Sequence, residues 1–299
     1  FLGLFALIFT TLSGQSFAKK HPTYASKTCN GQIQVVIHAS YGGGTDTTAR
    51  MMSIRTRRTL NTDIQIVGKR GGSGAKAQNY TLTRPKDGCT IMALTESHLY
   101  TMARGKSNMK IDDLVGVARA MEEPTFVVVN AKNKELSTVK KMQKRAQKKP
   151  ISVAIASIGG TEHIGMYSYS KAANIPFKAV SFGSGAQSLQ ALASGKVEAS
   201  LLNPSEAAAL IADKKIKAIV LLHDKALADY PKVKTSYSMG HKVKVVTTRG
   251  YAVLKGTPQS VIDEISKGMV KAMKHETFGN YLKGASLDPA TSPAGTKVW

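Results

Sequence analysis

Residues 33–60 read IQVVIHASYGGGTDTTARMMSIRTRRTL, and this stretch decides the class of fold. It opens with the apolar run 33–37, which is typical of a buried strand. The glycine-rich turn 42–46 follows, and the residues from Thr47 to Leu60 have the composition of a helix. A glycine-rich turn between a parallel strand and a helix presents backbone N–H groups at the positive end of the helix dipole. The stretch therefore predicts an anion-binding turn.

The rest of the chain repeats this alternation of strand and helix, which favours parallel α/β sheets. Asn203 and Pro204, with Glu206 at the third helical position, have the layout of a capping box, so a helix is expected to begin there. We expect strands at residues 33–38, 64–68, 90–94, 125–130, 151–156, 177–182, 197–202, 217–222 and 245–254, and helices at 46–60, 74–82, 137–149, 161–173, 185–194, 204–213 and 258–275.

The chain has 299 residues, which is long enough for two packed layers and two domains. The strand expected at 125–130 follows Pro124 and is a plausible crossover between the two. We therefore expect one domain to contain residues 19–123 and 225–299, and the other to contain residues 124–224.

Residues 1–18 differ in composition from the rest of the chain. The run from Phe1 to Phe9 is apolar and too short to span a bilayer, and Ser16 and Ala18 place small residues before two lysines. This layout is typical of a secretory signal peptide cleaved after Ala18, with the sequence starting inside the peptide. The alternative is a core strand or helix of the mature protein.

The chain contains two cysteines, Cys29 and Cys89, each just before an expected strand. If those strands are parallel neighbours, both sulfurs lie at the same end of the sheet. In an exported protein this arrangement favours a structural disulfide, and two buried free thiols are the alternative.

The formal charge is +23, from 42 Lys and Arg against 19 Asp and Glu. Such a charge attracts anions, nucleic acid among them. The lysines of the helix expected at 137–149 fall at helical spacing, as on an exposed cationic face. Nucleic-acid binding also requires aromatic side chains for stacking, and only 6% of residues are aromatic. We therefore interpret the charge as a solvated basic surface and expect no nucleic-acid partner.

A second glycine loop, residues 157–163, reads SIGGTEH and also joins an expected strand to an expected helix. Its hydroxyls at Ser157 and Thr161 add hydrogen-bond donors. A third loop of the same character occupies residues 182–186, and residues 71–74 form a fourth glycine-rich turn. Each loop alone is compatible with a plain turn. Two matched loops, one in each half of the chain, predict a cleft that holds one anionic ligand between two helix N-termini.

Nucleotide and catalytic motifs are incomplete. A dinucleotide fingerprint needs an acid after the second strand, where the sequence has Val67-Gly68-Lys69. Gly105-Lys106-Ser107 lacks the leading glycine of a Walker A loop and has Tyr100 there. Glu162 and His163 form a single pair without metal-ligand spacing. We expect no catalytic residue, metal or cofactor; His163 either donates to a ligand or packs near the helix start.

These loops, taken in order, resemble the extracytoplasmic solute-binding receptors of the tripartite tricarboxylate transporters, also called the Bug receptors. The resemblance runs from about residue 30 to residue 285. It rests on five collinear motifs: GGGTDTTAR at 42–50, PKDGCT at 85–90, GTEH at 160–163, FGSGA at 182–186 and TRG at 248–250.

The resemblance implies a two-domain type II periplasmic-binding-protein fold, of the α/β class, with a ligand cleft between the domains. It implies a monomeric, non-enzymatic receptor in the periplasm that captures a small organic carboxylate. Backbone N–H groups and waters of the first two glycine loops would hold the ligand. The closed form would then be recognised by the membrane subunits of the transporter.

The candidate ligand residues come from three loops and two later positions. We expect Asp46 to orient its loop or a water, because a carboxylate repels an anion. Arg249 is expected to contact a second carboxylate, with a surface arginine as the alternative. Asn203 is neutral where relatives often carry an acid or an amide, which favours a plain organic acid over an amino acid. The full set is Tyr41, Gly43, Gly44, Thr45, Asp46, Ser157, Gly160, Thr161, His163, Gly183, Asn203 and Arg249.

Three other functions are compatible with these features. A periplasmic receptor that feeds a signalling partner would need the same cleft. An enzyme acting on small anions would need a nucleophile and base that the motifs do not supply. An inducer-binding domain of a transcription regulator shares the fold class, but no helix-turn-helix precedes this one.

Overall fold

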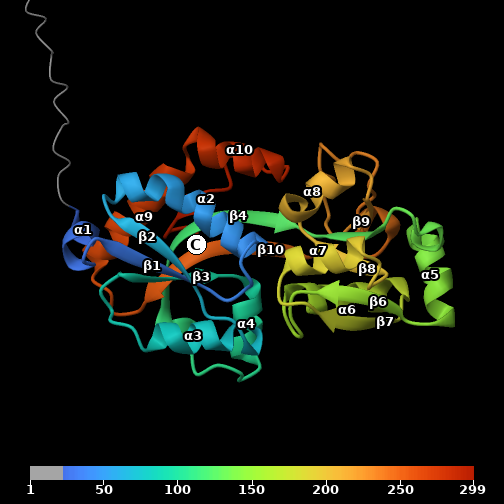
Figure 1. Cartoon of the computed structure of the whole chain (residues 1–299), viewed down its shortest axis with the longest axis horizontal. Helices are drawn as coiled ribbons and strands as arrows, with labels where there is room; N and C mark the ends of the chain where they lie inside the picture. Colours follow the sequence, from blue (N-terminus) through green and yellow to red (C-terminus); the bar gives the residue numbers. More distant parts are fainter. Residues whose placement is uncertain (1–22) are drawn as a thin grey trace, which may run out of the picture.

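The computed structural model describes residues 23–299, so the expected signal peptide and its cleavage site lie outside the described residues. The described chain forms two β-sheets that lie side by side, each with its own helices (Figure 1). The strand order is β11-β4-β10-β3-β1-β2 in the six-stranded sheet and β7-β6-β8-β5-β9 in the five-stranded sheet. We call these the first and second sheets.

Both sheets are mixed, whereas the alternation of strands and helices predicted parallel sheets. In the first sheet β1 pairs in parallel with β2 and β3, and β10 runs antiparallel to β3 and β4. In the second sheet β6 is parallel to β7 and β8, and β5 is antiparallel to β8 and β9. The strands are β1 Gln32–Ile37, β2 Asp63–Gly68, β3 Thr90–Leu94, β4 Leu114–Pro124, β5 Phe126–Asn130, β6 Ile151–Ile155, β7 Phe177–Ser181, β8 Ala199–Leu202, β9 Ile216–Leu221, β10 Val246–Leu254 and β11 Ala294–Gly295.

The helices of the first sheet cover both of its faces: α2, α9 and α10 lie on one side, α3 and α4 on the other (Figure 1). Within residues 23–299, no helix has both the length and the apolar composition needed to cross a membrane. The helices are α1 Tyr24–Thr28, α2 Gly44–Thr59, α3 Ala75–Leu82, α4 Glu96–Ala103, α5 Val139–Lys148, α6 Thr161–Ala173, α7 Gly185–Ala193, α8 Pro204–Ala212, α9 Gln259–Met273 and α10 Glu276–Gly284.

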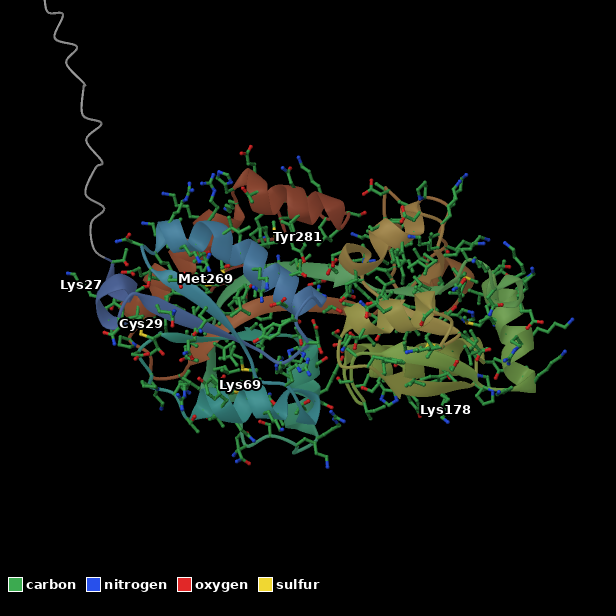
Figure 2. The ribbon with its side chains drawn as sticks, in the orientation of Figure 1. Lys27, Cys29, Lys69, Lys178, Met269 and Tyr281 are labelled. Atoms are coloured by element: carbon green, nitrogen blue, oxygen red, sulfur yellow. A yellow bond between two sulfur atoms is a disulfide. The ribbon has the colours of Figure 1, made fainter. Side chains whose placement is uncertain are left out.

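Each sheet has its own apolar core. Beneath α2 and α9 the first sheet buries Met52, Ile265 and Met269 against strands whose side chains, such as Val35, are fully buried. Figure 2 labels Met269 at this packing layer. Each such side chain contributes about 1.5–3 kcal/mol on burial. The apolar side chains of the two sheets therefore form separate cores, the first and the second.

A disulfide joins Cys29 to Cys89. Cys29 precedes β1 and Cys89 precedes β3, and these strands are parallel neighbours, so both sulfurs lie at one end of the sheet. The bond closes a 60-residue separation, which in the chain-entropy model stabilises the fold by about 4 kcal/mol. The reasoning that favoured a disulfide thus agrees with the structure.

The basic helix expected at 137–149 is α5. It buries Val139, Met142 and Ala146 against the second core, while its lysines at 140, 141, 144 and 148 are exposed. Arg145 alone of this run turns inward, where its guanidinium pairs with Glu198 at 2.6 Å. The cationic face is therefore directed into solvent.

Within residues 23–299 the chain passes between the sheets twice. Strand β4 continues into β5 through Thr125, and the segment after β9 returns to β10, where Val246 pairs with Pro124. Before it returns, this segment packs against the second sheet. Leu227 and Tyr230 contact one of the apolar clusters of that sheet, and Val243 contacts the other. The two crossings therefore run side by side as antiparallel strands.

Candidate functional site

A cavity of about 640 Å³ lies among the loops that follow β1, β2 and β3 of the first sheet and β6 and β7 of the second. Three helices begin at it, since the first residues of α2, α6 and α7 all line its wall. It is lined by residues 38–40, 43–45, 70–74, 95, 97, 156–158, 161–162, 181–185, 187, 206, 247 and 249. The N-termini of three helices therefore converge on one space, as the two matched loops predicted for a pair of them.

The first glycine loop contributes Gly43, Gly44 and Thr45 to the cavity wall. Gly44 is the first residue of α2, and no side chain fits there: an added Cβ would overlap Nη2 of Arg249 and lie 3.0 Å from Oε1 of Glu206. The glycine thus permits two charged side chains to approach the end of the helix.

Two other candidates of this loop lie away from the cavity. Asp46 is only 2% exposed; its carboxylate accepts the N–H of Gly42 at 2.8 Å and pairs with Arg50 at 2.9 Å. These contacts fix the turn from behind. Tyr41 is 56% exposed, and its hydroxyl accepts the N–H of Gly68 at 3.0 Å.

The second glycine loop places Ser157 and Thr161 on the wall. Gly160 is the N-cap of α6 and stands just behind them. The His163 side chain lines a separate surface pocket, and its Nδ1 accepts the N–H of Gly159 at 2.9 Å. Burial, followed by the charge of Arg104, lowers the pKa of His163, which is consistent with the neutral acceptor in this bond.

Arg249, on β10, lines the cavity although it is only 5% exposed. Its Nη1 forms a short ion pair with Glu123, and its Nη2 donates to Oδ1 of Asn203 at 3.1 Å. Its Nε is buried without a hydrogen-bond partner in the described part of the chain. Burial alone would lower the pKa of Arg249, but the charge of Glu123 dominates in raising it above its ordinary range.

The other two candidates take different positions. Gly183 lines the wall in a left-handed conformation, with φ of +88°. Asn203 does not reach the cavity: its Nδ2 donates to the carbonyl of Pro124 at 3.0 Å, so it joins α8 to the crossing strand and supports Arg249 from behind.

Glu206 has a role that its sequence context did not reveal. It was expected only as the third residue of a capping box, and its Oε2 does accept the N–H of Asn203 at 3.3 Å. Its Oε1 also accepts the N–H of Gly44, at the start of α2, at 3.1 Å. With Gly44 it separates the main cavity from a smaller one of about 170 Å³, which Tyr281 also lines.

The bond between Glu206 and Gly44 is one of several that cross between loops of the two sheets. Ser97 Oγ accepts the N–H of Thr161 at 3.1 Å, and the Ser40 hydroxyl contacts Oε1 of Gln187 at 3.0 Å. Ser73 Oγ donates to the carbonyl of Ile158 at 2.9 Å. The rims of the cavity are therefore in direct contact in this structure.

Glu162, the second residue of α6, lines the cavity, and sequence reasoning considered it only as a partner of His163. Its Oε2 is buried and has no hydrogen-bond partner among residues 23–299. Burial is the main cause that raises its pKa to about 7, and the hydrogen bond that the carboxyl accepts from its own backbone N–H opposes this shift. The charges of Glu206 and Glu96 add to the shift and that of Arg249 opposes it.

His38, at the end of β1, also faces the cavity, and its Nδ1 is buried without a partner in the described chain. Burial, with a smaller contribution from Arg249, lowers its pKa to about 4, so the imidazole is neutral at physiological pH. It therefore adds no positive charge to the cavity wall.

Comparison with protein families gives one match over most of the chain. A family model described as tripartite tricarboxylate transporter family receptor matches residues 48–296. Protein BugT of Bordetella pertussis is 22% identical over 277 residues, covering 89% of this chain and 82% of BugT.

Solved structures share the fold. MatC of Rhodopseudomonas palustris, solved with bound malate, has a TM-score of 0.81 and 21% identity, with 87% of this chain and 90% of MatC covered. Another protein of Rhodopseudomonas palustris, solved with adipate, has a TM-score of 0.80 and 19% identity, with coverage of 86% and 88%. Both cover nearly the whole described chain, so the two-sheet architecture is the one these proteins share.

Proposed function

Since the chain belongs to the receptor family of the tripartite tricarboxylate transporters, we propose that it captures a small organic carboxylate for a transporter of that type. The solved relatives that hold malate and adipate support a carboxylate as the ligand. The observation that carries the proposal is the convergence of α2, α6 and α7 on one cavity, because helix N-termini stabilise anions.

We propose that the ligand contacts these residues of the wall: Gly43, Gly44, Thr45, Ser157, Thr161, Gly183 and Arg249. In the structure the N–H groups of Gly44 and Thr161 donate to Glu206 and Ser97, so a ligand that bound them would replace these two acceptors. The Nε of Arg249 supports this role, because it is a buried cationic donor without a partner in the described chain. The remaining candidates act on the site indirectly: Asp46 fixes the first turn, His163 the second, Asn203 supports Arg249, and Tyr41 and Gly160 shape the loops.

We propose that the molecule divides into two domains, 19–123 with 225–299 and 124–224, with the cavity between them. One adjustment is supported by packing: residues 225–245 lie against the second core, so the return crossing falls near Val245. In this scheme the ligand binds an open form, and closure forms the rim contacts such as Ser97 to Thr161.

The setting of this activity is also proposed. The receptor works in the periplasm after cleavage behind Ala18, as a monomer without enzymatic activity, and the membrane subunits of the transporter recognise its closed form. The disulfide between Cys29 and Cys89 supports an oxidising compartment.

The test is a thermal-shift screen of the mature protein against mono-, di- and tricarboxylates, with sugars as controls. A ligand that binds only the native state raises the melting temperature in proportion to RT ln(1 + [L]/Kd). We expect at least one carboxylate to raise it by several degrees. A screen in which sugars shift the melting temperature and carboxylates do not would contradict the proposal.

A further inference from the structure

The cavity contains more acid than a site for a plain anion requires. Arg249 is its buried cation, and that charge is already opposed by Glu123, which is fully buried. Arg70, at the rim, is exposed and donates to the Ser40 hydroxyl at 3.1 Å. Against these, Glu206 and Glu162 both line the wall. A ligand that carries a positively charged donor beside its carboxylate would find acceptors in these two acids.

The two acids differ in how they are satisfied. Glu206 accepts two backbone N–H groups, from Gly44 and Asn203, so its charge is held by hydrogen bonds. Glu162 takes part in none of the salt bridges formed within residues 23–299, and its Oε2 is buried without a partner there. A buried carboxylate oxygen without a partner costs free energy unless a ligand supplies one.

We propose that Glu162 binds a protonated amine of the ligand, so that the carboxylate captured by this receptor is an amino acid rather than a plain organic acid. The inference rests on the proposed function, because the carboxylate of the ligand is assigned to the helix N-termini and Arg249. It reverses the expectation drawn from Asn203, which assigned amine recognition to a position that does not reach the cavity.

Geometry supports this assignment over a purely structural role for Glu162. An acid in the first turn of a helix stabilises the dipole equally well when it faces solvent. Glu276 in the first turn of α10 is such a case, since it is exposed. Glu162 instead lines the cavity at the start of α6, one residue after Thr161, whose backbone N–H donates to Ser97 Oγ at 3.1 Å.

The raised pKa of Glu162 is consistent with an empty amine subsite. Burial favours the protonated acid in the free protein, and an ammonium group beside it would favour the carboxylate. Binding of an amino acid near neutral pH should then release a proton from Glu162. A plain acid would instead leave Glu162 protonated.

The experiment is isothermal titration with matched pairs that differ only in the amine: aspartate and succinate, glutamate and glutarate, alanine and propionate, phenylalanine and 3-phenylpropionate. Wild-type protein is compared with Glu162→Gln, and Glu276→Gln is the control for an acid in a helical first turn. We expect the amino acid of at least one pair to bind tenfold or more tightly than its partner. Glu162→Gln should remove most of that preference, and Glu276→Gln should keep it.

A second readout needs no variant. Titrations of wild-type protein near pH 7 in buffers of different ionisation enthalpy count the protons released. We expect release with the amino acid and none with its partner. Plain acids that bind as tightly as amino acids, with no proton released, would overturn the inference and leave the proposed function standing. Binding by neither series would overturn both.

Discussion

The two sides of the cavity each have a glycine-rich turn that leads into a helix, with an acidic residue in the first turn of that helix. They differ in where the acidic side chain points. On the first side, the turn before α2 is followed by Asp46, the third residue of the helix, whose carboxylate turns back to Gly42 and Arg50. On the second side, the turn before α6 is followed by Glu162, the second residue, whose carboxylate faces the cavity. An acid at the third helical position, Asp46, thus fixes its loop, whereas an acid at the second position, Glu162, lines the cavity.

The largest expected effect comes from removing the cation between these sides. Arg249→Met leaves Glu123 buried without its counter-charge, and breaking a buried pair in this way costs about 3–5 kcal/mol of stability. Urea unfolding monitored by circular dichroism measures the loss. The double variant with Glu123→Gln should recover part of it; no recovery would contradict the pairing.

A second variant breaks the first side alone. Gly44→Ala places a Cβ against Nη2 of Arg249 and 3.0 Å from Glu206, so both side chains must move from the start of α2. We expect ligand affinity to fall 100-fold or more, about 2.7 kcal/mol, with a smaller loss of stability than for Arg249→Met because the buried pair with Glu123 is displaced and not removed. Gly284→Ala, at a glycine whose added Cβ meets nothing within 4 Å, is the control. Equal affinities for the two variants would show that the start of α2 does not contact ligand.

The acid of the second side predicts a dependence of stability on pH. The pKa of Glu162 is raised to about 7, so the folded state binds its proton more tightly than the unfolded state, whose pKa is near 4.5. The contribution of this group therefore makes the ligand-free protein lose stability as pH rises from about 4.5 to 7, on the order of 1–3 kcal/mol. Melting temperatures across this range should fall less steeply for Glu162→Gln. A slope unchanged by the variant would count against the burial of this carboxyl.

The smallest expected effect comes from Asp46, the acid of the first side. Asp46→Asn weakens the bond to Gly42 and the pair with the half-exposed Arg50, which together stabilise the turn by about 1 kcal/mol. Affinity should fall a few-fold, equally for amino acids and plain acids, because only the loop is loosened. If Asp46→Asn instead changed the preference between amino acids and plain acids, Asp46 would share the role proposed for Glu162.

Sequence patterns predicted those elements whose hydrophobic period is strong, within about two residues. They missed β4, where Gly116, Arg119 and two glutamates interrupt the apolar run, and α4, which is only eight residues long. They also missed α10, which begins three residues after α9 ends. In each case tertiary packing, more than local periodicity, determines the element.

The site divides in the same way. Backbone-dominated positions such as Gly44 could be expected, because a glycine turn before a helix has one geometry wherever it occurs. The positions of side chains could not: Tyr41 and Asn203 point elsewhere, and Glu206 reaches Gly44 across 162 positions of sequence. A capping-box motif does not indicate which backbone groups of a distant helix the glutamate also contacts.

The paired strands at Pro124 and Val246 have a mechanical consequence. Two antiparallel strands that cross side by side form a two-stranded hinge. Such a hinge permits rotation about one axis and restricts twisting and sliding of one sheet relative to the other. In the domain closure proposed above, bending at these two strands breaks none of the contacts between the rims. The resistance to opening therefore resides at the rims, in the few hydrogen bonds farthest from the hinge, where each acts with the longest lever arm. A substitution at Ser97 or Ser73 should consequently change how fast the molecule opens more than any substitution in the hinge.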